Sequence, residues 1–293
     1  MTVRLQHRGS AFGSRVESDL PLPLGASSSA LGGSVWIRRG EPERVYPTDR
    51  RLERLGAPQE VKGVVSPRRR TVWVDPTEQD PWAVSGTVMG LSLPHLLSAR
   101  GSMVLRASCA VKDGTAVAFV GGGRSGKSSI AAGLVASGWR LVADDSLVLN
   151  TSDDAVRVRP SFPALKLWTP LAASLASSLR AETAPTDREL DRRWVFLGEK
   201  HWWSRPRVDL ACLCLLEHGP PDELRGPQTV LSVLAATYDP DPGLKRNWRR
   251  WFEGAHRLAS SVPVLRLPVP AHFDPRFRFV RAVTRHLRAA GLV

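Results

Sequence analysis

Apolar positions in the first hundred residues form short runs separated by glycine, proline and charged residues. Three of these runs cover residues 34–37, 61–65 and 71–74. Runs of this length between turn-forming residues are typical of short strands. No long linker rich in Ser, Gly and Pro follows them. The pattern therefore predicts a β-rich N-terminal extension, residues 1–99, that packs on the rest of the chain.

From Leu105 onward, apolar runs alternate with segments of helical character. The predicted strands cover residues 116–120, 140–143, 208–216 and 262–267. Part of the segment 169–203 is predicted to be helical. A C-terminal helix is predicted to start at Pro275 after the capping residue Asp274, with one apolar face formed by Val280, Val283 and Leu287. This alternation predicts an α/β unit, residues 100–293, in which helices cover a sheet.

A glycine-rich segment joins one of these strands to the helix after it. The run 116–120 leads into Gly-Gly-Gly-Arg-Ser-Gly-Lys-Ser at 121–128, and a helix is predicted over 129–137 with Gly138 as its stop. This order satisfies the Walker A pattern G-x-x-x-x-G-K-[ST] of a phosphate-binding loop, in which backbone N–H groups surround phosphate oxygens. The residues predicted to bind the nucleotide are Gly121, Gly122, Gly123, Arg124, Ser125, Gly126, Lys127, Ser128 and Ser129.

Two adjacent carboxylates follow the next predicted strand. A right-handed crossover returns strand 140–143 parallel to strand 116–120, so that both strands end at the same edge of the sheet. Asp144 and Asp145 would then face the loop, where Lys127 reaches the β and γ phosphates and Ser128 holds Mg²⁺. One carboxylate can engage the metal, while the other accepts a proton from an attacking hydroxyl.

The loop, its helix and the strand ending in the acidic pair resemble the catalytic core of the HPr kinase/phosphorylase family. The segment is also similar to HPr-kinase-like enzymes that phosphorylate ribosomally made peptides, including the lasso-peptide kinases. The similarity to the second group extends through residues 105–111, 162–168, 200–217 and 262–267. It covers roughly residues 80–290 weakly and 105–168 well.

The resemblance implies a fold and a set of roles. The fold would be a phosphoenolpyruvate-carboxykinase-like P-loop core with a mixed sheet. Lys127 would bind phosphate, Ser128 would be a magnesium ligand, and Asp145 would accept the proton of the target hydroxyl. Asp144 would lie beside Asp145, at the metal or at the hydroxyl. The implied cofactors are ATP and Mg²⁺.

Two features depart from the family pattern. Where these families place a histidine before the loop, this chain has Arg106. Arginine stays protonated near neutral pH, so Arg106 is expected to stabilise phosphate charge rather than to transfer protons. The Glu-x-Arg-Gly element that bifunctional members use for phosphate removal is not found downstream. Phosphorylase activity is therefore not expected.

The charge balance narrows the choice of partners. The 293 residues include 41 Lys and Arg against 28 Asp and Glu, a formal net charge of +13. Such an excess favours anionic partners, among them nucleotides and acidic peptides. The cations are scattered along the chain, and no zinc-finger spacing, ribonucleoprotein motif or basic coiled coil accompanies them. This argues against nucleic acid as the partner.

Cysteine usage and hydropathy indicate the compartment. The chain has an odd number of cysteines, Cys109, Cys212 and Cys214, and no metal-ligating residues lie near them in the sequence. This predicts buried thiols in a reducing environment. The sequence shows no signal-peptide pattern and no apolar stretch of about 18 residues, the length that a membrane span needs. We therefore expect a soluble, cytoplasmic protein without a membrane partner.

Several residues outside the loop have both a functional and a structural interpretation. Lys166 either faces solvent from a strand or meets the substrate. One of Lys200, Arg205 and Arg207 would approach the transferred phosphoryl group if the resemblance extends to this segment. The Trp-rich segments 201–203 and 248–252 form either a peptide-docking surface or part of the core. None of the seven His residues has metal-ligand spacing.

The leading hypothesis is an ATP-dependent kinase that transfers the γ-phosphoryl group to a Ser or Thr hydroxyl, in a ribosomally made precursor peptide. The alternatives are a kinase of an HPr-like carrier protein or of a small hydroxylated metabolite, and a non-catalytic nucleotide-binding regulatory protein. Guanine-reading, transporter and eukaryotic protein-kinase motifs are absent from the sequence. The acceptor, the choice of ATP over GTP and the formation of a homo-oligomer are left open.

Overall fold

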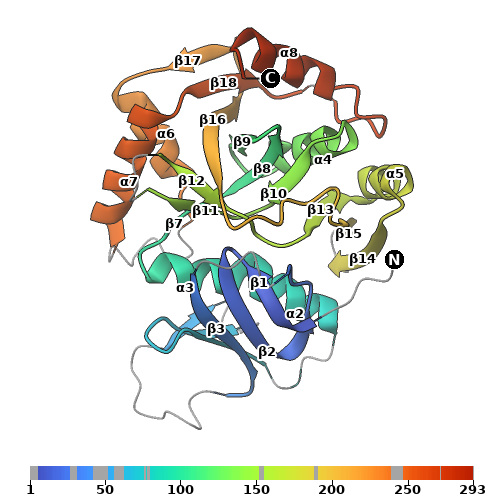
Figure 1. Ribbon diagram of the computed structural model, residues 1–293, viewed down its shortest axis with the longest axis vertical. Coiled ribbons are helices and arrows are strands. Elements are labelled where there is room, and N and C mark those ends of the chain that lie inside the picture. The colour runs from blue at the N-terminus through green and yellow to red at the C-terminus, as the bar shows by residue number, and fades with distance from the viewer. Residues whose placement is uncertain are drawn as a thin grey trace.

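The computed structural model describes residues 6–26, 32–41, 52–55, 63–75, 77, 80–151, 155–187, 191–238, 247–270 and 272–292 of the chain. These residues form a mixed α/β protein in which an N-terminal sheet lies against a larger α/β part (Figure 1). The mixed α/β class predicted from the sequence is confirmed.

The first sheet contains the strands predicted in the N-terminal extension. Its described members run in the order β1-β2-β3-β6-β5-β4. Their bounds are β1 Gln6–Ala11, β2 Ser14–Leu22, β3 Gly32–Arg39, β4 Glu53–Leu55, β5 Gly63–Ser66 and β6 Thr71–Val74. The predicted strand 34–37 lies within β3 and 71–74 coincides with β6. The part of the predicted strand 61–65 before Gly63 lies outside the described residues.

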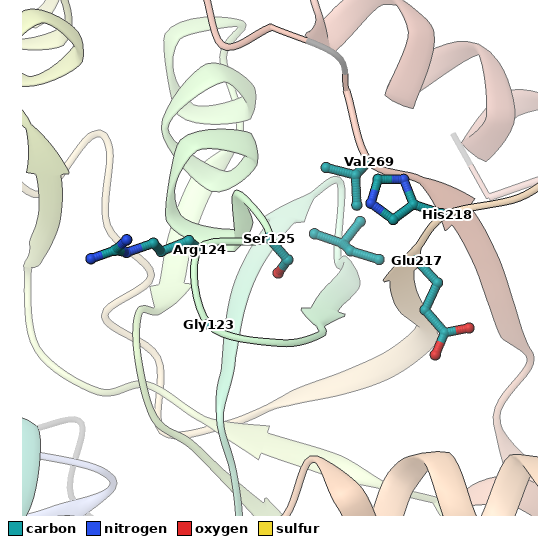
Figure 2. A pocket seen from close by; sticks show the side chains of 7 residues that line it. Gly123, Arg124, Ser125, Glu217, His218 and Val269 are labelled. Atoms are coloured by element: carbon teal, nitrogen blue, oxygen red, sulfur yellow. The ribbon is translucent and has the colours of Figure 1, made fainter.

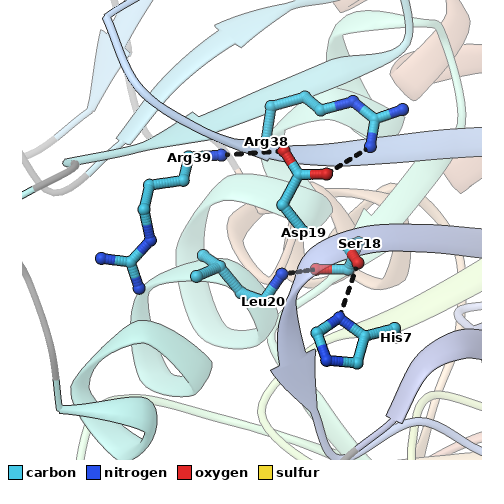
Figure 3. Close-up of polar contacts among 6 residues, drawn as sticks. All are labelled: His7, Ser18, Asp19, Leu20, Arg38 and Arg39. Carbon is cyan, nitrogen blue, oxygen red and sulfur yellow. Dashed lines mark hydrogen bonds and ion pairs between the residues drawn. The ribbon is translucent and has the colours of Figure 1, made fainter.

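Polar contacts connect the first three strands (Figure 3). Asp19 of β2 accepts a hydrogen bond of 2.7 Å from the Arg38 guanidinium and one of 3.4 Å from the backbone N–H of Arg39, both in β3. From β1, Nδ1 of His7 donates to the carbonyl oxygen of Ser18 at 3.0 Å. Exposed ion pairs such as Arg38–Asp19 contribute at most about 1 kcal/mol, so this contact mainly helps to fix the strand register.

A continuous helical run connects the N-terminal sheet with the rest of the protein. It consists of α2 Pro81–Thr87, the π-helix η2 Val88–Ser92 and α3 Leu93–Ala99. Asp80 caps its start, because the carboxylate accepts a hydrogen bond of 2.9 Å from the N–H of Trp82. The run lies between the N-terminal sheet and the larger part (Figure 1). One hydrophobic cluster joins all three regions and includes Ile37, Val88, Met89, Leu96, Phe162, Trp194 and Tyr238.

The larger sheet carries the glycine-rich segment. Its described strands run in the order β10-β8-β9-β16-β12-β11-β7, with β18 paired to β16 and β17 paired to β18. Their bounds are β7 Met103–Leu105, β8 Ala107–Lys112, β9 Thr115–Val120, β10 Arg140–Ala143, β11 Leu147–Asn150, β12 Arg157–Arg159, β16 Val208–Glu217, β17 Asp222–Leu224 and β18 Val264–Pro268. Strands β9, β16 and β18 are parallel, whereas β8 is antiparallel to both β9 and β10. The sheet is therefore mixed.

Helices cover both faces of this sheet. On one face lie α4 Lys127–Ala136, α5 Thr169–Leu179 and α8 Val280–Ala289, and on the other lie α6 Pro227–Ala235 and α7 Trp248–Ser261. Alternate residues of β9 mark the two faces: Phe119 joins the cluster that contains Ile130 of α4, and Ala118 joins the cluster that contains Leu258 of α7. Because both faces are buried, β9 has a continuous apolar sequence.

A small antiparallel sheet lies beside α5. Its described strands run in the order β13-β15-β14, with bounds β13 Ala164–Trp168, β14 Glu182–Asp187 and β15 Arg192–Phe196. The prediction of partial helix within 169–203 is confirmed by α5. The two strands that follow α5 were not predicted.

The C-terminal helix starts later than the sequence predicts. Asp274 does accept hydrogen bonds of 3.0 Å from the backbone N–H groups of Arg276 and Arg278. These bonds close a turn rather than a helix, because Phe277 has a φ of +54°, outside the right-handed helical region. The helix α8 therefore starts at Val280. Its predicted apolar face is confirmed, since one cluster contains Val280, Val283 and Leu287.

The cysteines are buried thiols, as predicted. Cys212 and Cys214 in β16 lie on the same face, with their sulfur atoms 3.8 Å apart. Cys109 in β8 belongs to the cluster on the other face. None of the three cysteines forms a disulfide bond, and all three side chains are fully buried.

Candidate active site

The glycine-rich segment forms the turn between β9 and α4. Gly121 and Gly126 have φ angles of +151° and +90°, which side chains other than glycine rarely adopt. Both positions are also crowded, because an added Cβ would lie 2.9 Å from the carbonyl oxygen of Leu216 at Gly121 and 1.9 Å from the Phe273 ring at Gly126. The turn therefore leads directly into the N-terminus of α4, where the partial positive charge of the helix lies.

Lys127 folds back over this turn. Its Nζ donates hydrogen bonds of 2.9 and 2.8 Å to the carbonyl oxygens of Gly121 and Gly122. Burial lowers the pKa of Lys127; the carboxylates of Asp145 and Asp144 raise this pKa, and the Arg106 guanidinium lowers it. The lysine, both carboxylates and the arginine are thus close enough to act on one another.

Sheet topology explains why the acidic pair reaches the turn. Strand β10 is antiparallel to β8, and β8 is antiparallel to β9. Strand β10 therefore runs parallel to β9, and both end at the same edge of the sheet. The structure has the strand direction that the sequence predicts, although β8 lies between the two strands.

Asp144 is a buried carboxylate with several donors around it. It is 2% exposed, and it accepts hydrogen bonds of 2.6 Å from Ser108 Oγ and 3.0 Å from the backbone N–H of Lys166. Burial raises the pKa of Asp144, while the hydrogen bonds from Lys166, Ser108 and the Ser128 side chain lower it. Ser128 therefore lies near Asp144, and these are the two residues that the sequence assigns to magnesium.

Asp145 is exposed, in contrast to its neighbour. Its φ of +66° lies in the left-handed region, which Asp and Asn tolerate better than most other residues. The turn at this residue sends the side chain of Asp144 into the protein and that of Asp145 towards the surface. The pair is therefore divided into an inner and an outer carboxylate.

Arg106 lies at the bend between β7 and β8 and rests on an aromatic ring. Its guanidinium is 4.9 Å from the ring centre of Tyr238, and its backbone N–H donates to the carbonyl of Ala236 at 2.7 Å. Tyr238 is 2% exposed and its hydroxyl donates to the carbonyl of Leu91 at 3.0 Å. Tyr238 therefore packs against Arg106 and connects it to η2 through the carbonyl of Leu91.

A cavity of about 510 Å³ lies beside the turn, on the side of β16 and β18. Its lining residues are Gly123, Arg124, Ser125, Leu216, Glu217, His218 and Val269. Figure 2 shows that the Arg124 side chain extends away from the other labelled side chains of this cavity. Because β10 lies on the other side of β9 from β16, the cavity and the acidic pair flank the turn on opposite sides.

Of the four other cationic residues that the sequence singles out, Lys166, Arg205 and Arg207 make structural contacts. Lys166 contributes its backbone N–H to Asp144, and its Nζ lies 6.0 Å from the Trp194 ring centre. The guanidinium of Arg205 lies 5.3 Å from the ring centre of Trp203, and the carbonyl of Arg207 accepts a hydrogen bond from Trp203 Nε1 at 3.4 Å. Lys200 is exposed in a turn.

The two Trp-rich segments have different environments. Trp202 and Trp203 are each 4% exposed and belong to the core. On α7, Trp248 is 60% and Phe252 46% exposed, with ring centres 6.5 Å apart. The core interpretation is therefore correct for the first segment, and the second segment lies at the surface.

Several groups around the acidic pair were not predicted from the sequence. Ser108 lies in the family-like segment 105–111, so the resemblance offered a signal for it. Tyr238 is far from Arg106 in sequence, and the two meet through the bridge between Leu105 and Thr237. No local pattern marks this long-range contact.

Within the described part of the chain, no group of three or more His, Cys, Asp and Glu side chains could hold a metal ion. Magnesium at Ser128 and Asp144 would therefore need further oxygens from the nucleotide and from water, which is the usual way that Mg²⁺ binds. Among the described helices, none combines the length and the apolar character needed to cross a membrane.

No protein-family model and no curated protein matches the chain. Among solved structures, the chain is similar to the HPr(Ser) kinase/phosphatase from Coxiella burnetii, with a TM-score of 0.36 and 13% sequence identity. The matched region covers 64% of this chain and 93% of the other.

Proposed function

We propose that the protein is an ATP-dependent kinase that phosphorylates a Ser or Thr hydroxyl of a peptide. The observation that carries this proposal is that β9 and β10 end at the same edge of the sheet, which brings Asp144 and Asp145 near Lys127 of the glycine-rich turn. A cation for the phosphates, an inner carboxylate in contact with a hydroxyl and an outer carboxylate are the groups that phosphoryl transfer to an alcohol requires. The proposed architecture is an HPr-kinase-like P-loop core, residues 100–293, with residues 1–99 as a packed extension.

The turn and the cavity beside it would hold the nucleotide. Backbone N–H groups of residues 121–128 and the N-terminus of α4 suit the phosphate oxygens. Lys127 would exchange its bonds to the loop carbonyls for bonds to phosphate oxygens. The cavity offers a carboxylate from Glu217, an imidazole from His218 and apolar surface from Val269 to the nucleoside.

Asp144 and Ser128 fit a magnesium ion. Their side chains lie near each other, and both present oxygen atoms, the ligands that Mg²⁺ prefers. The metal, when bound, would neutralise phosphate charge. Ser108 and the N–H of Lys166 hold the Asp144 carboxylate in place and favour its ionised form.

Asp145 would act as the proton acceptor. The acceptor oxygen forms a bond to the γ-phosphorus while the bond to the β–γ bridging oxygen breaks, and the hydroxyl proton passes to Asp145. Arg106 would stabilise the charge spread over the transferred group. Its rigid support on Tyr238 reduces the cost of holding the guanidinium in one position.

A ribosomally made peptide is the proposed acceptor class. Trp168 is 65% exposed and ends β13, the strand whose Lys166 N–H binds Asp144. An exposed aromatic side chain on a strand that contacts the acidic pair suits the docking of an extended peptide. Five tryptophans cannot contribute to such a surface because they are buried in the core: Trp73, Trp139, Trp194, Trp202 and Trp203.

The test is incubation of the purified protein with Mg²⁺, γ-labelled ATP and synthetic peptides centred on Ser or Thr. A short precursor peptide encoded beside this chain should be included where one exists. Free serine, simple sugars and an HPr-like carrier protein serve as parallel acceptors. We expect label on peptide Ser or Thr side chains, located by mass spectrometry.

Each other outcome corresponds to one of the alternatives. Label found only on small alcohols or only on the carrier protein would replace the acceptor and keep the phosphoryl-transfer chemistry. Nucleotide binding without transfer to any acceptor would contradict the kinase proposal and favour a regulatory nucleotide-binding protein.

A further inference from the structure

The π-helix η2 faces the outer carboxylate of the proposed site. A Cβ built on Gly90, in the middle of η2, would lie 3.6 Å from Oδ2 of Asp145 and would meet no other atom within 4 Å. Any side chain at position 90 would therefore start in van der Waals contact with that carboxylate oxygen. The hydrogen atom of glycine leaves this oxygen accessible.

Backbone conformation does not explain the glycine at this position. Gly90 has no positive φ, so other residues could adopt its backbone angles. Glycine within a helix costs about 0.5–1 kcal/mol relative to alanine because it loses more chain entropy. Short π-helical segments occur often at functional sites. The missing side chain is thus best explained by the space that it leaves beside Asp145.

The same π-helix is also connected, through Tyr238, to Arg106. The carbonyl of Leu91 accepts the hydrogen bond from the Tyr238 hydroxyl, and the Tyr238 ring supports Arg106. Adjacent residues of η2 therefore reach both Asp145 and the support of Arg106. One short element therefore borders the outer side of the site.

We infer that Gly90 is a specificity-determining residue that sets how large an acceptor can reach Asp145. The inference rests on the proposed function. A peptide Ser or Thr hydroxyl would enter between η2 and Asp145, with its backbone passing over Gly90, where no Cβ blocks the approach. Nucleotide binding is assigned to the glycine-rich turn, and a Cβ at position 90 would meet none of its residues within 4 Å, so nucleotide binding should not depend on position 90.

A cysteine introduced at position 90 can be modified chemically after the protein has folded. The modification enlarges the side chain beside Asp145. The three native cysteines are fully buried, and burial raises the pKa of Cys109 and Cys214, which keeps these thiols unreactive. Gly90→Cys would therefore carry the reactive thiol. The matched control is Gly86→Cys, since Gly86 lies in the same helical run and a Cβ there would meet nothing within 4 Å.

Both variants would be treated with methyl methanethiosulfonate and with a bulkier thiosulfonate, and then reduced with dithiothreitol. The measurements are MgATP affinity, ATP hydrolysis by water and transfer to Ser-centred peptides. We expect modified Gly90→Cys to lose peptide transfer by about a hundredfold, the scale of displacing a reacting group by about 1 Å. MgATP affinity and hydrolysis by water should be retained, the loss should increase with reagent size, and reduction should restore transfer.

Modified Gly90→Cys that transfers to peptide as fast as modified Gly86→Cys overturns the inference and leaves the kinase proposal standing. A parallel loss of MgATP affinity also overturns it, because position 90 would then act on the nucleotide. Unmodified wild-type protein that transfers to no hydroxyl overturns the proposed function, and the inference with it.

Discussion

Asp144 shows how a single residue meets opposing requirements. Its charge is needed for the magnesium role, yet burial disfavours that charge and raises the pKa. Ser108 and the N–H of Lys166 partly offset this effect by donating to the two carboxylate oxygens. The local environment therefore opposes ionisation of Asp144 through burial and supports it through hydrogen bonds.

This conflict predicts how Asp144→Asn changes the dependence of stability on pH. A raised folded-state pKa stabilises the protein below the pKa of an unfolded aspartate, and this stabilisation is lost as pH rises through the raised value. Asparagine does not titrate, so the melting temperature of Asp144→Asn should rise relative to wild type between acidic and neutral pH. Phosphoryl transfer should fall and should require a higher Mg²⁺ concentration, because a proposed metal ligand is weakened. A variant whose melting temperature falls further below wild type as pH rises would contradict this.

Substitutions of Asp145 should separate the effect on phosphoryl transfer from the effect on folding. Asparagine tolerates the left-handed backbone, so Asp145→Asn should fold and bind MgATP normally while transfer falls by about 10²–10⁴-fold, the usual contribution of a general base. Asp145→Ala should lose transfer similarly and also lose about 1–2 kcal/mol of stability through backbone strain. In magnesium titrations of the transfer rate, Asp144→Asn should shift the midpoint more than Asp145→Asn. The opposite order would exchange the two roles.

Arg106 is expected to act through charge. Arg106→Ala should reduce transfer by about a hundredfold, the scale of removing one preorganised donor, and Arg106→Lys should keep part of the rate. Tyr238→Phe retains the supporting ring and should stay nearer to wild type than Tyr238→Leu, measured as kcat with saturating MgATP. An Arg106→Ala protein as active as wild type would place this residue outside the site.

At the scale of elements, local patterns were predictable and long-range pairings were not. The strand β9, the glycine-rich turn and α4 follow from an apolar run, a spaced motif and a Gly138 stop, all contained in neighbouring residues. The insertion of β8 between β9 and β10 depends on strand pairing, which no single segment encodes. Only strands were predicted from the sequence in residues 1–99, so the helical run with η2 and the position of Gly90 beside Asp145 were missed.

Two glycines of the turn should differ in how much their substitution by alanine lowers the melting temperature. Gly126→Ala should lower the melting temperature, because the left-handed backbone costs about 1–2 kcal/mol with a side chain and the new Cβ collides with Phe273. Gly122→Ala should change the melting temperature little, since a Cβ there meets nothing within 4 Å. Equal melting temperatures for the two variants would contradict the described turn.

At the scale of the whole molecule, the N-terminal sheet and the larger part share one hydrophobic cluster. Side chains from β3, from the helical run and from β15 meet in it, including Ile37, Met89, Trp194 and Phe196. The proposed site lies where these regions join, because η2 belongs to the helical run and Asp145 lies in the bend between β10 and β11 of the larger sheet. The N-terminal residues therefore help to form the outer border of the proposed acceptor site, in addition to packing on the core.

The most direct test of the central claim compares wild type with Lys127→Ala on one Ser or Thr peptide substrate. The measurement is the ADP released together with the phosphate found on the peptide side chain by mass spectrometry. Wild type should give one phosphopeptide per ADP above the level of hydrolysis by water. Lys127→Ala should reduce both products by about 10²–10³-fold, because the cation at the phosphates is lost. Wild-type turnover in Lys127→Ala would contradict the assignment of the glycine-rich turn as the phosphate site.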